Sequence, residues 1–142
     1  MGFFKSSVKS LVGRGDVRGL IDRLDQKDMG EASIGLKVLG ERAVPALIEE
    51  LGTTKGDIAC VVLADIGVPA LPALVEVIRS GHEDRVIAAG VAISQMRSKG
   101  VRLPDDIVAA LVAVKTGGAG VDISRRLAAA SALGPLDVRS SF

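Results

Sequence analysis

The stretch GERAVPALIEEL at residues 40–51 returns 27 positions later as GVPALPALVEVI at residues 67–78. Leu20, Leu47 and Leu74 share this spacing. Tandem similarity at a fixed period of this length indicates stacked supersecondary units, each burying its apolar face against its neighbours. The sequence therefore predicts an all-α fold of repeated two-helix units.

Each unit is expected to have a first helix that ends at a hydrophobic–Gly pair, followed by a second helix. Pro45 and Pro72 fit the first turn of the second helices, where a backbone N–H has no intrahelical acceptor. Helical spacing predicts a buried stripe in the second helix at 42–52. Aspartates that precede runs of helix-forming residues are expected to begin other helices as N-caps. The stripe is Val44, Leu47, Ile48 and Leu51, and the expected N-caps are Asp16 (for a helix to about residue 25), Asp28, Asp57 and Asp84.

The ends of the chain depart from the period. We expect a short N-terminal cap helix at 3–12, in which Phe3 and Phe4 cover the first unit. After Ser94, in the position of Gly40 and Gly67, the segment QMRSKGVRLP interrupts the period and should lie at one edge of the stack. A second helix at about 104–115 and a last, unpaired first helix at about 122–133 follow, and residues 135–142 are expected to be loose. Two registers, one residue apart, fit the helix at about 104–115. One buries Ile107, Ala110, Leu111 and Val114, and the other aligns the helix with the earlier repeats at Leu111. We prefer the first register.

Composition supports one domain spanning residues 1–142. The chain is 48% hydrophobic and 25% charged, which excludes a disordered polymer, and its net charge of +1 provides no global field. A single cysteine, the lack of an apolar leader and the absence of a long uncharged apolar run predict a cytoplasmic protein without a transmembrane segment.

The repeat resembles the HEAT-like family, specifically the short repeats of phycobilisome lyases, in which an Ala-rich helix ends in Leu-Gly before a segment such as AVPALIEAL. Residues 38–51 and 66–78 carry this resemblance. It implies a right-handed α-solenoid of about four two-helix HEAT-like repeats over residues 13–134. The family includes scaffolds, chaperone-like lyase subunits, hydroxylases and DNA glycosylases, so the resemblance implies a fold more than a function. Ser94 and the insertion depart from the family pattern.

Candidate catalytic chemistry is sparse. His82-Glu83 is similar to the His-Glu dyads of HEAT-repeat deoxyhypusine hydroxylases, but one pair supplies at most two metal ligands. Cys60 lies in the apolar segment IACVVLADIG, with no His or Lys within one helical turn, so we expect a buried structural thiol. We predict no enzymatic activity, no catalytic or cofactor-binding residue, no metal and no cofactor.

The distribution of charge argues against nucleic acid as a partner. Basic residues predominate at 1–28 and 79–103, but seven acidic and three basic residues at 29–78 separate them. The chain has no Trp or Tyr to stack on a base.

The outward face of the second helices offers a candidate binding surface. Opposite the buried stripe at 42–52, three carboxylates spaced by 27 residues fall beside small residues. Such a row forms a shallow acidic groove for a basic or extended segment on the concave side of a solenoid, or is ordinary solvated surface. The candidate partner-binding residues are Asp22, Arg42, Ala46, Glu49, Ala73 and Glu76.

These observations predict a scaffold or adaptor that binds another protein through the concave face. The alternative is a chaperone-like accessory subunit of a modifying enzyme, as the lyase resemblance implies. Self-association through the apolar ends, around Phe3, Phe4 and Leu133, is a further option.

Overall fold

The computed structural model of the chain describes residues 7–118 and 120–134, and every regular element within them is helical. The all-α class is therefore confirmed for this part of the chain. The predicted loose tail at 135–142 and the Phe3-Phe4 pair lie outside the described residues. The elements are α1 (Val8–Gly13), α2 (Val17–Asp22), α3 (Met29–Leu39), the 3-10 helix η1 (Gly40–Ala43), α4 (Val44–Glu50), α5 (Gly56–Ile66), the 3-10 helix η2 (Val68–Ala70), α6 (Leu71–Ser80), α7 (Glu83–Ser98), α8 (Asp105–Lys115) and α9 (Ile123–Leu133).

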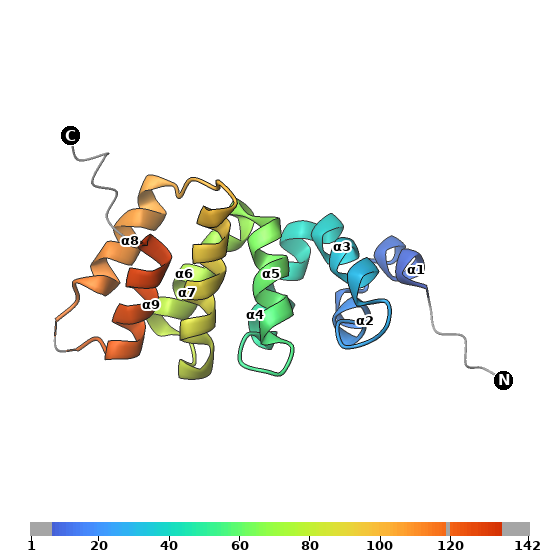
Figure 1. The fold of residues 1–142 in the computed structure, drawn as a ribbon, viewed down its shortest axis with the longest axis horizontal. Helices are drawn as coiled ribbons and strands as arrows, with labels where there is room; N and C mark the ends of the chain where they lie inside the picture. Colours follow the sequence, from blue (N-terminus) through green and yellow to red (C-terminus); the bar gives the residue numbers. More distant parts are fainter. Residues whose placement is uncertain (1–6, 119, 135–142) are drawn as a thin grey trace.

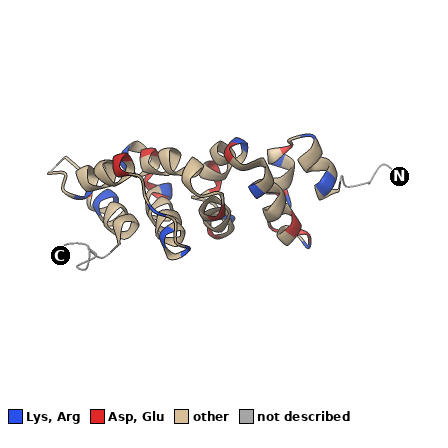
Figure 2. Ribbon diagram, turned by 90° about the horizontal axis from the view of Figure 1, so that it is seen from above, with Lys and Arg blue, Asp and Glu red and all other residues tan. Residues whose placement is uncertain are grey.

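The helices pack in two rows along the long axis of the molecule (Figures 1 and 2). Row A consists of α1, α3, α5, α7 and α9, and each of these helices contacts the next one in the row. Row B consists of α2, α4, α6 and α8, which are in contact in the same order. Every row B helix also packs on the row A helix that follows it in sequence. This alternation places each expected first helix in row A and each expected second helix in row B.

Local capping follows the sequence at several helix ends. The Asp16 carboxylate accepts the backbone N–H of Gly19 at 2.9 Å, and that of Asp122 accepts the N–H of Arg125 at 2.9 Å. Gly40 and Gly67 end α3 and α5 with φ of 59° and 81°, in the left-handed region that favours glycine. The predicted glycine C-caps are therefore confirmed.

Two predicted aspartate caps, Asp57 and Asp84, are wrong. The N-cap positions of α5 and α7 belong to Lys55 and His82, which puts Asp57 and Asp84 inside the first turns. There the positive end of the helix dipole stabilises the carboxylates, which do not cap a backbone N–H. Asp28 does occupy the N-cap position of α3, but its carboxylate makes no cap hydrogen bond and instead pairs with Arg23 at 2.7 Å.

Several predicted helix boundaries in the first half of the chain also differ. The Ser7 hydroxyl accepts the N–H of Ser10 from an extended N-cap conformation, so α1 begins at Val8 and not at residue 3. It packs on both α2 and α3, as the first helix of a pair does. Helix α2 ends at Asp22, short of residue 25, and the segment predicted as one helix at 42–52 is η1 followed by α4.

The insertion after Ser94 is partly helical. Serine does not favour the positive φ that ends α3 and α5 at glycine, and α7 continues to Ser98. Met96, on this extra turn, is fully buried. The loop from 99 to 104 then returns the chain to row B and buries Leu103.

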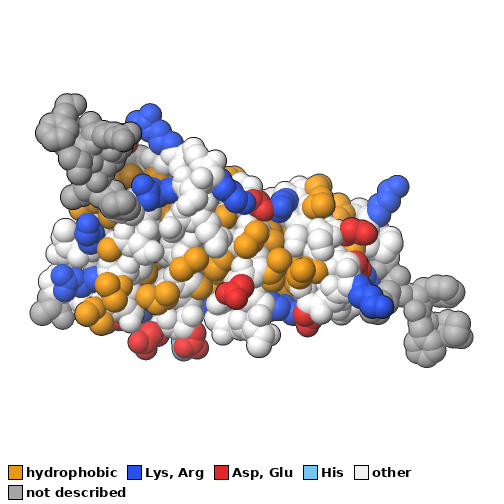
Figure 3. Space-filling model, in the orientation of Figure 1, with side chains coloured by type: hydrophobic (Ala, Val, Ile, Leu, Met, Phe, Trp, Pro, Cys, Tyr) orange, Lys and Arg blue, Asp and Glu red, His pale blue; other side chains and the backbone are white. Residues whose placement is uncertain are grey.

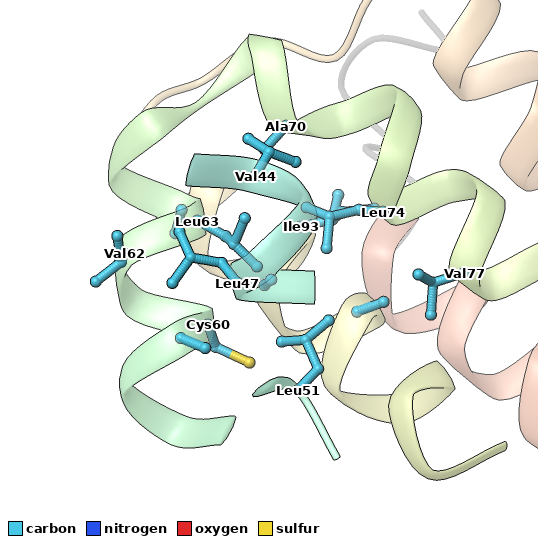
Figure 4. Packing of buried hydrophobic residues seen from close by; sticks show 14 of the residues in the cluster. Val44, Leu47, Leu51, Cys60, Val62, Leu63, Ala70, Leu74, Val77 and Ile93 are labelled. Atoms are coloured by element: carbon cyan, nitrogen blue, oxygen red, sulfur yellow. The ribbon is translucent and has the colours of Figure 1, made fainter. Parts of the chain in front are cut away.

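The core follows the 27-residue period. Leu20, Leu47 and Leu74 are fully buried, and Figure 4 shows Leu47 and Leu74 among aliphatic side chains from both rows. The preferred register of α8 is confirmed in its main features, because Ile107, Leu111 and Val114 are buried while Ala110 is half-buried. Of the stripe predicted at 42–52, only Ile48 is half-buried; the other three side chains are buried.

Within row A, α7 packs closely against α9. A Cβ added to Gly90 would lie 2.7 Å from the Ala128 carbonyl oxygen and 3.0 Å from the Ala128 Cα. These are backbone atoms, which cannot turn away as a side-chain end can. The contact between α7 and α9 thus depends on the missing side chain at residue 90.

Replacing Leu47 with Ala should lower the free energy of unfolding by about 2–5 kcal/mol, because it opens a cavity at the centre of the core. Glu49→Ala, two residues away on the exposed side of α4, should change it by under about 0.5 kcal/mol. Urea denaturation measures both. Equal losses would contradict the observed orientation of α4.

Gly90→Ala should destabilise the protein by about 1–3 kcal/mol, since α7 and α9 must move apart to admit the methyl group. Gly30→Ala is the matched control. Gly30 also lies in a row A helix, a Cβ there meets nothing within 4 Å, and helix propensity predicts a gain of up to about 1 kcal/mol. Thermal unfolding should show opposite shifts, and a neutral Gly90→Ala variant would argue against the close approach.

Candidate functional site

The residues predicted to bind a partner lie on successive helices of row B. Asp22, Glu49 and Glu76 are exposed on α2, α4 and α6, which are neighbours in the row. Ala46 and Ala73 are half-buried beside them, and Arg42 is exposed in η1. The fold therefore places the three carboxylates in the order that the period predicts.

Arginines compensate two of these carboxylates. From α2, Arg18 Nη2 lies 3.1 Å from Glu49 Oε2 on α4, and its Nη1 lies 3.6 Å from Glu50 Oε2. Glu76 pairs with Arg79 at 3.3 Å and accepts the Ser80 hydroxyl at 2.7 Å. The face is therefore closer to charge balance than to an acidic groove. The spacing of Glu76 and Arg79 on one helix could have indicated their pair, but the contact of Arg18 with Glu49, 31 residues apart, depends on the fold.

Row A carries a surface that the sequence analysis did not identify. Apolar side chains that are 39–71% exposed lie on four successive helices, α3, α5, α7 and α9. In Figure 3 hydrophobic side chains cross this face of the molecule from one end towards the other. We call this set the row A stripe; its members are Ile34, Val38, Val61, Ile87, Val91, Ile123 and Leu127.

One signal in the sequence could have indicated the stripe. Ile34 and Val61 are 27 residues apart, and both occupy the face of their helix opposite the buried residues. Ile87 and Leu127 each follow the N-cap residue of their helix by five positions. Ile34 and Val61 follow their N-cap residues by six positions, so the sequence signals the stripe separately on α3 with α5 and on α7 with α9, and not at one equivalent position on all four helices.

Charged residues of opposite sign border the row A stripe. At the N-terminal ends of the helices, exposed carboxylates occupy the first turns or the N-cap. Near the C-terminal ends, basic side chains occupy the last turns of α3 and α7 and the residue after α7. This distribution favours the dipole of each helix. The acidic border is Glu31, Asp57, Glu83 and Asp84, whereas at α9 the Asp122 carboxylate pairs with Arg125 at 3.3 Å; the basic border is Lys37, Arg97 and Lys99.

One carboxylate lies within the basic border. Asp65, whose side chain is 18% exposed, pairs with Lys37 Nζ at 2.6 Å through Oδ2 and with Lys99 through Oδ1. The three residues join α3, α5 and the end of α7. Two lysines around one carboxylate leave a net positive charge, so the border remains basic.

A hollow of about 620 Å³ lies between α6, α8 and α9, and its lining includes Arg79, Ala113 and Arg125. The Arg125 guanidinium donates to the carbonyl oxygens of Val77, Ile78 and Gly81 at 3.3, 3.1 and 2.7 Å. It thereby satisfies the carbonyls at the C-terminal end of α6. Arg125 therefore has a structural role that ties α9 to α6.

The residues considered for catalysis take structural positions. The His82 ring is exposed, and its Nδ1 accepts the N–H of Asp84 at 3.4 Å as the N-cap of α7. Within residues 7–118 and 120–134, no group of three or more His, Cys, Asp and Glu side chains could hold a metal ion.

The Cys60 thiol is buried between α5 and α7. It donates to the Ala88 carbonyl oxygen at 3.3 Å. Burial, with a smaller contribution from the charge of Asp57, raises the pKa of this thiol to about 11. The thiol is therefore protonated at neutral pH and is a poor nucleophile.

Comparisons of the chain with protein-family models, curated proteins and solved structures gave no match. In the part of the chain that the structure describes, no helix by itself is long and apolar enough to cross a membrane. Only α5 and α6 taken together have the necessary length and composition, and the chain bends by 120° at the break between them.

Alkylation of Cys60 by iodoacetamide should be slower by on the order of 100-fold in the folded protein than in denaturant at pH 8, since a pKa of about 11 instead of 9.0 lowers the thiolate fraction by that factor. Because the unfolded thiol ionises first, stability should also fall as the pH rises from about 9 to 11. Mass spectrometry follows the labelling. Comparable rates in both states would show that α5 and α7 do not shield the thiol.

Proposed function

We propose that this chain is a HEAT-like α-solenoid that acts as a protein-interaction scaffold, and that it binds through the row A stripe. Two rows of helices, a 27-residue period and glycine C-caps at Gly40 and Gly67 support the solenoid. Stacked units of this kind present a continuous face over several repeats, which suits binding of an extended or flat protein surface.

The observation that carries the proposal is the stripe itself. Its seven apolar residues, each 39–71% exposed, lie on four helices that contact one another in order. Single exposed apolar residues are common and need no explanation. Recurrence on four neighbouring helices, with charged borders, is the arrangement of an interface with an apolar centre and a polar rim.

Row B supports the proposal less strongly. Its predicted carboxylates contact Arg18 and Arg79, and exposed pairs of this kind contribute little net free energy to binding or folding. A basic segment would have to displace these arginines. Binding of such a segment at Asp22, Glu49 and Glu76 remains a prediction, as does the alternative function of an accessory subunit of a modifying enzyme.

Val61→Lys should abolish protein binding, because it places a charge at the centre of the stripe. The new lysine has Asp57 one turn before it, which favours the helix. Val112→Lys on α8 is the matched control: Val61 is 41% and Val112 42% exposed, but Val112 lies in row B.

The chain is immobilised and exposed to an extract of cells that produce it. The measurement is the amount of protein that the immobilised chain retains, and further copies of the chain are included in that amount. Val61→Lys should reduce the bound protein at least tenfold, while Val112→Lys should retain it. Circular dichroism establishes that both variants are folded. Equal binding by the two folded variants would contradict a role for the row A stripe.

A further inference from the structure

We infer that the partner on the row A stripe is a second copy of this chain, packed face to face with the two chains running in the same direction. The inference rests on the proposed function and specifies the partner of the same surface. It follows from the symmetry of the charged borders and from the size of the apolar area.

The area is that of a stable interface. A standard interface buries about 800 Å² on each partner, which the seven exposed residues of the stripe and the charged borders beside them can supply together. The borders supply the polar rim. A homodimer of this size needs no additional element from outside the described residues.

Two symmetric arrangements bring one stripe onto another. With the two-fold axis parallel to the stripe, each helix of row A lies over the same helix of the partner and runs in the opposite direction. With the axis across the stripe, α3 lies over α9 of the partner, and the N-terminal ends of the helices coincide. A two-fold interface uses one surface twice, so the charges on that surface decide between the arrangements.

The borders favour the first arrangement. It places the acidic border of one copy over the basic border of the other: Glu31 faces Lys37 of the second copy, and Asp84 faces Lys99 of the second copy. It also sets the helix dipoles antiparallel. The second arrangement places Asp57 on α5 over Glu83 and Asp84 on α7 of the other copy, so carboxylates meet carboxylates at one edge.

The same pattern favours a second copy over another class of partner. A uniformly basic or uniformly acidic partner would complement one border and be repelled by the other. The surface needs a partner with an apolar centre, one acidic edge and one basic edge at the same separation. The row A face of this chain meets that requirement in the first arrangement.

The first experiment measures the mass of the purified chain. Light scattering between about 1 and 100 μM, a range that brackets dissociation constants of micromolar dimers, should give the mass of two chains for the wild type and for Val112→Lys. Val61→Lys should give one chain. Raising the salt should weaken the dimer at least severalfold, because the borders are solvated and screened.

The second experiment tests the direction of the chains by disulfide trapping. In a Cys60→Ala background, Ile34→Cys and Leu127→Cys, near opposite ends of the stripe, should each form a disulfide with the same residue of the second copy. Val112→Cys, in row B, should not. If the axis crossed the stripe, Ile34→Cys and Leu127→Cys would fail separately, and the double variant would link residue 34 to residue 127 between chains.

Each outcome decides one of the two proposals. A wild-type chain that stays monomeric up to 100 μM overturns the second copy as partner. If the monomeric chain binds a different protein from the extract, and Val61→Lys abolishes this binding while Val112→Lys does not, the scaffold proposal is supported without the dimer. A dimer that Val61→Lys does not dissociate, or a disulfide only between residues 34 and 127, overturns the inferred packing.

Discussion

The structure depends on burying one aliphatic side chain per unit at the same place between the two rows. Leu20, Leu47 and Leu74 are fully buried because each unit covers the next, and a helix pair of this size has too little core to fold by itself. The constraint fixes the rotation of the row B helices about their axes. It therefore also fixes which side chains those helices present to solvent.

Row A is subject to a second constraint, the distance between its helices. Cys60, Ala88, Gly90 and Ala128 are small, and α5, α7 and α9 approach closely through them. With small residues on the two flanks of each helix, larger apolar residues such as Ile87 and Val91 are left on the outward side of α7. The row A stripe and the tight packing of row A are thus two aspects of one distribution of side-chain volume.

The charged residues make the two edges of the row A face different. On α3 and α7, acidic residues occupy the first turn and basic residues the last turn, as the helix dipole favours for isolated helices. Since the row A helices point the same way, the local preference becomes a border on each side of the stripe. Ion pairing around Asp65 does not reverse the sign of its border.

Much of the architecture could be predicted from the sequence by itself. The period, the proline positions and the Leu-Gly helix ends determined the all-α class, the order of the helices and most of the core, because these depend on interactions within one or two turns of chain. Predictions failed where one local signal is compatible with two structures. An aspartate such as Asp57 suits the first turn of a helix as well as the N-cap position, and Ser94 does not force a helix to end. The row B carboxylates could be placed on one face for the same reason that the core could.

Only the tertiary structure decided which exposed residues lie next to one another. The contact of Arg18 with Glu49, the pairing of Asp65 with both lysines and the continuity of the stripe over α3, α5, α7 and α9 join residues that are distant in the chain. The rotation of each helix against its neighbours creates these contacts, and that rotation depends on how all the buried side chains pack together. A sequence pattern specifies the buried side of one helix, but the surface shared by several helices exists only once they are packed.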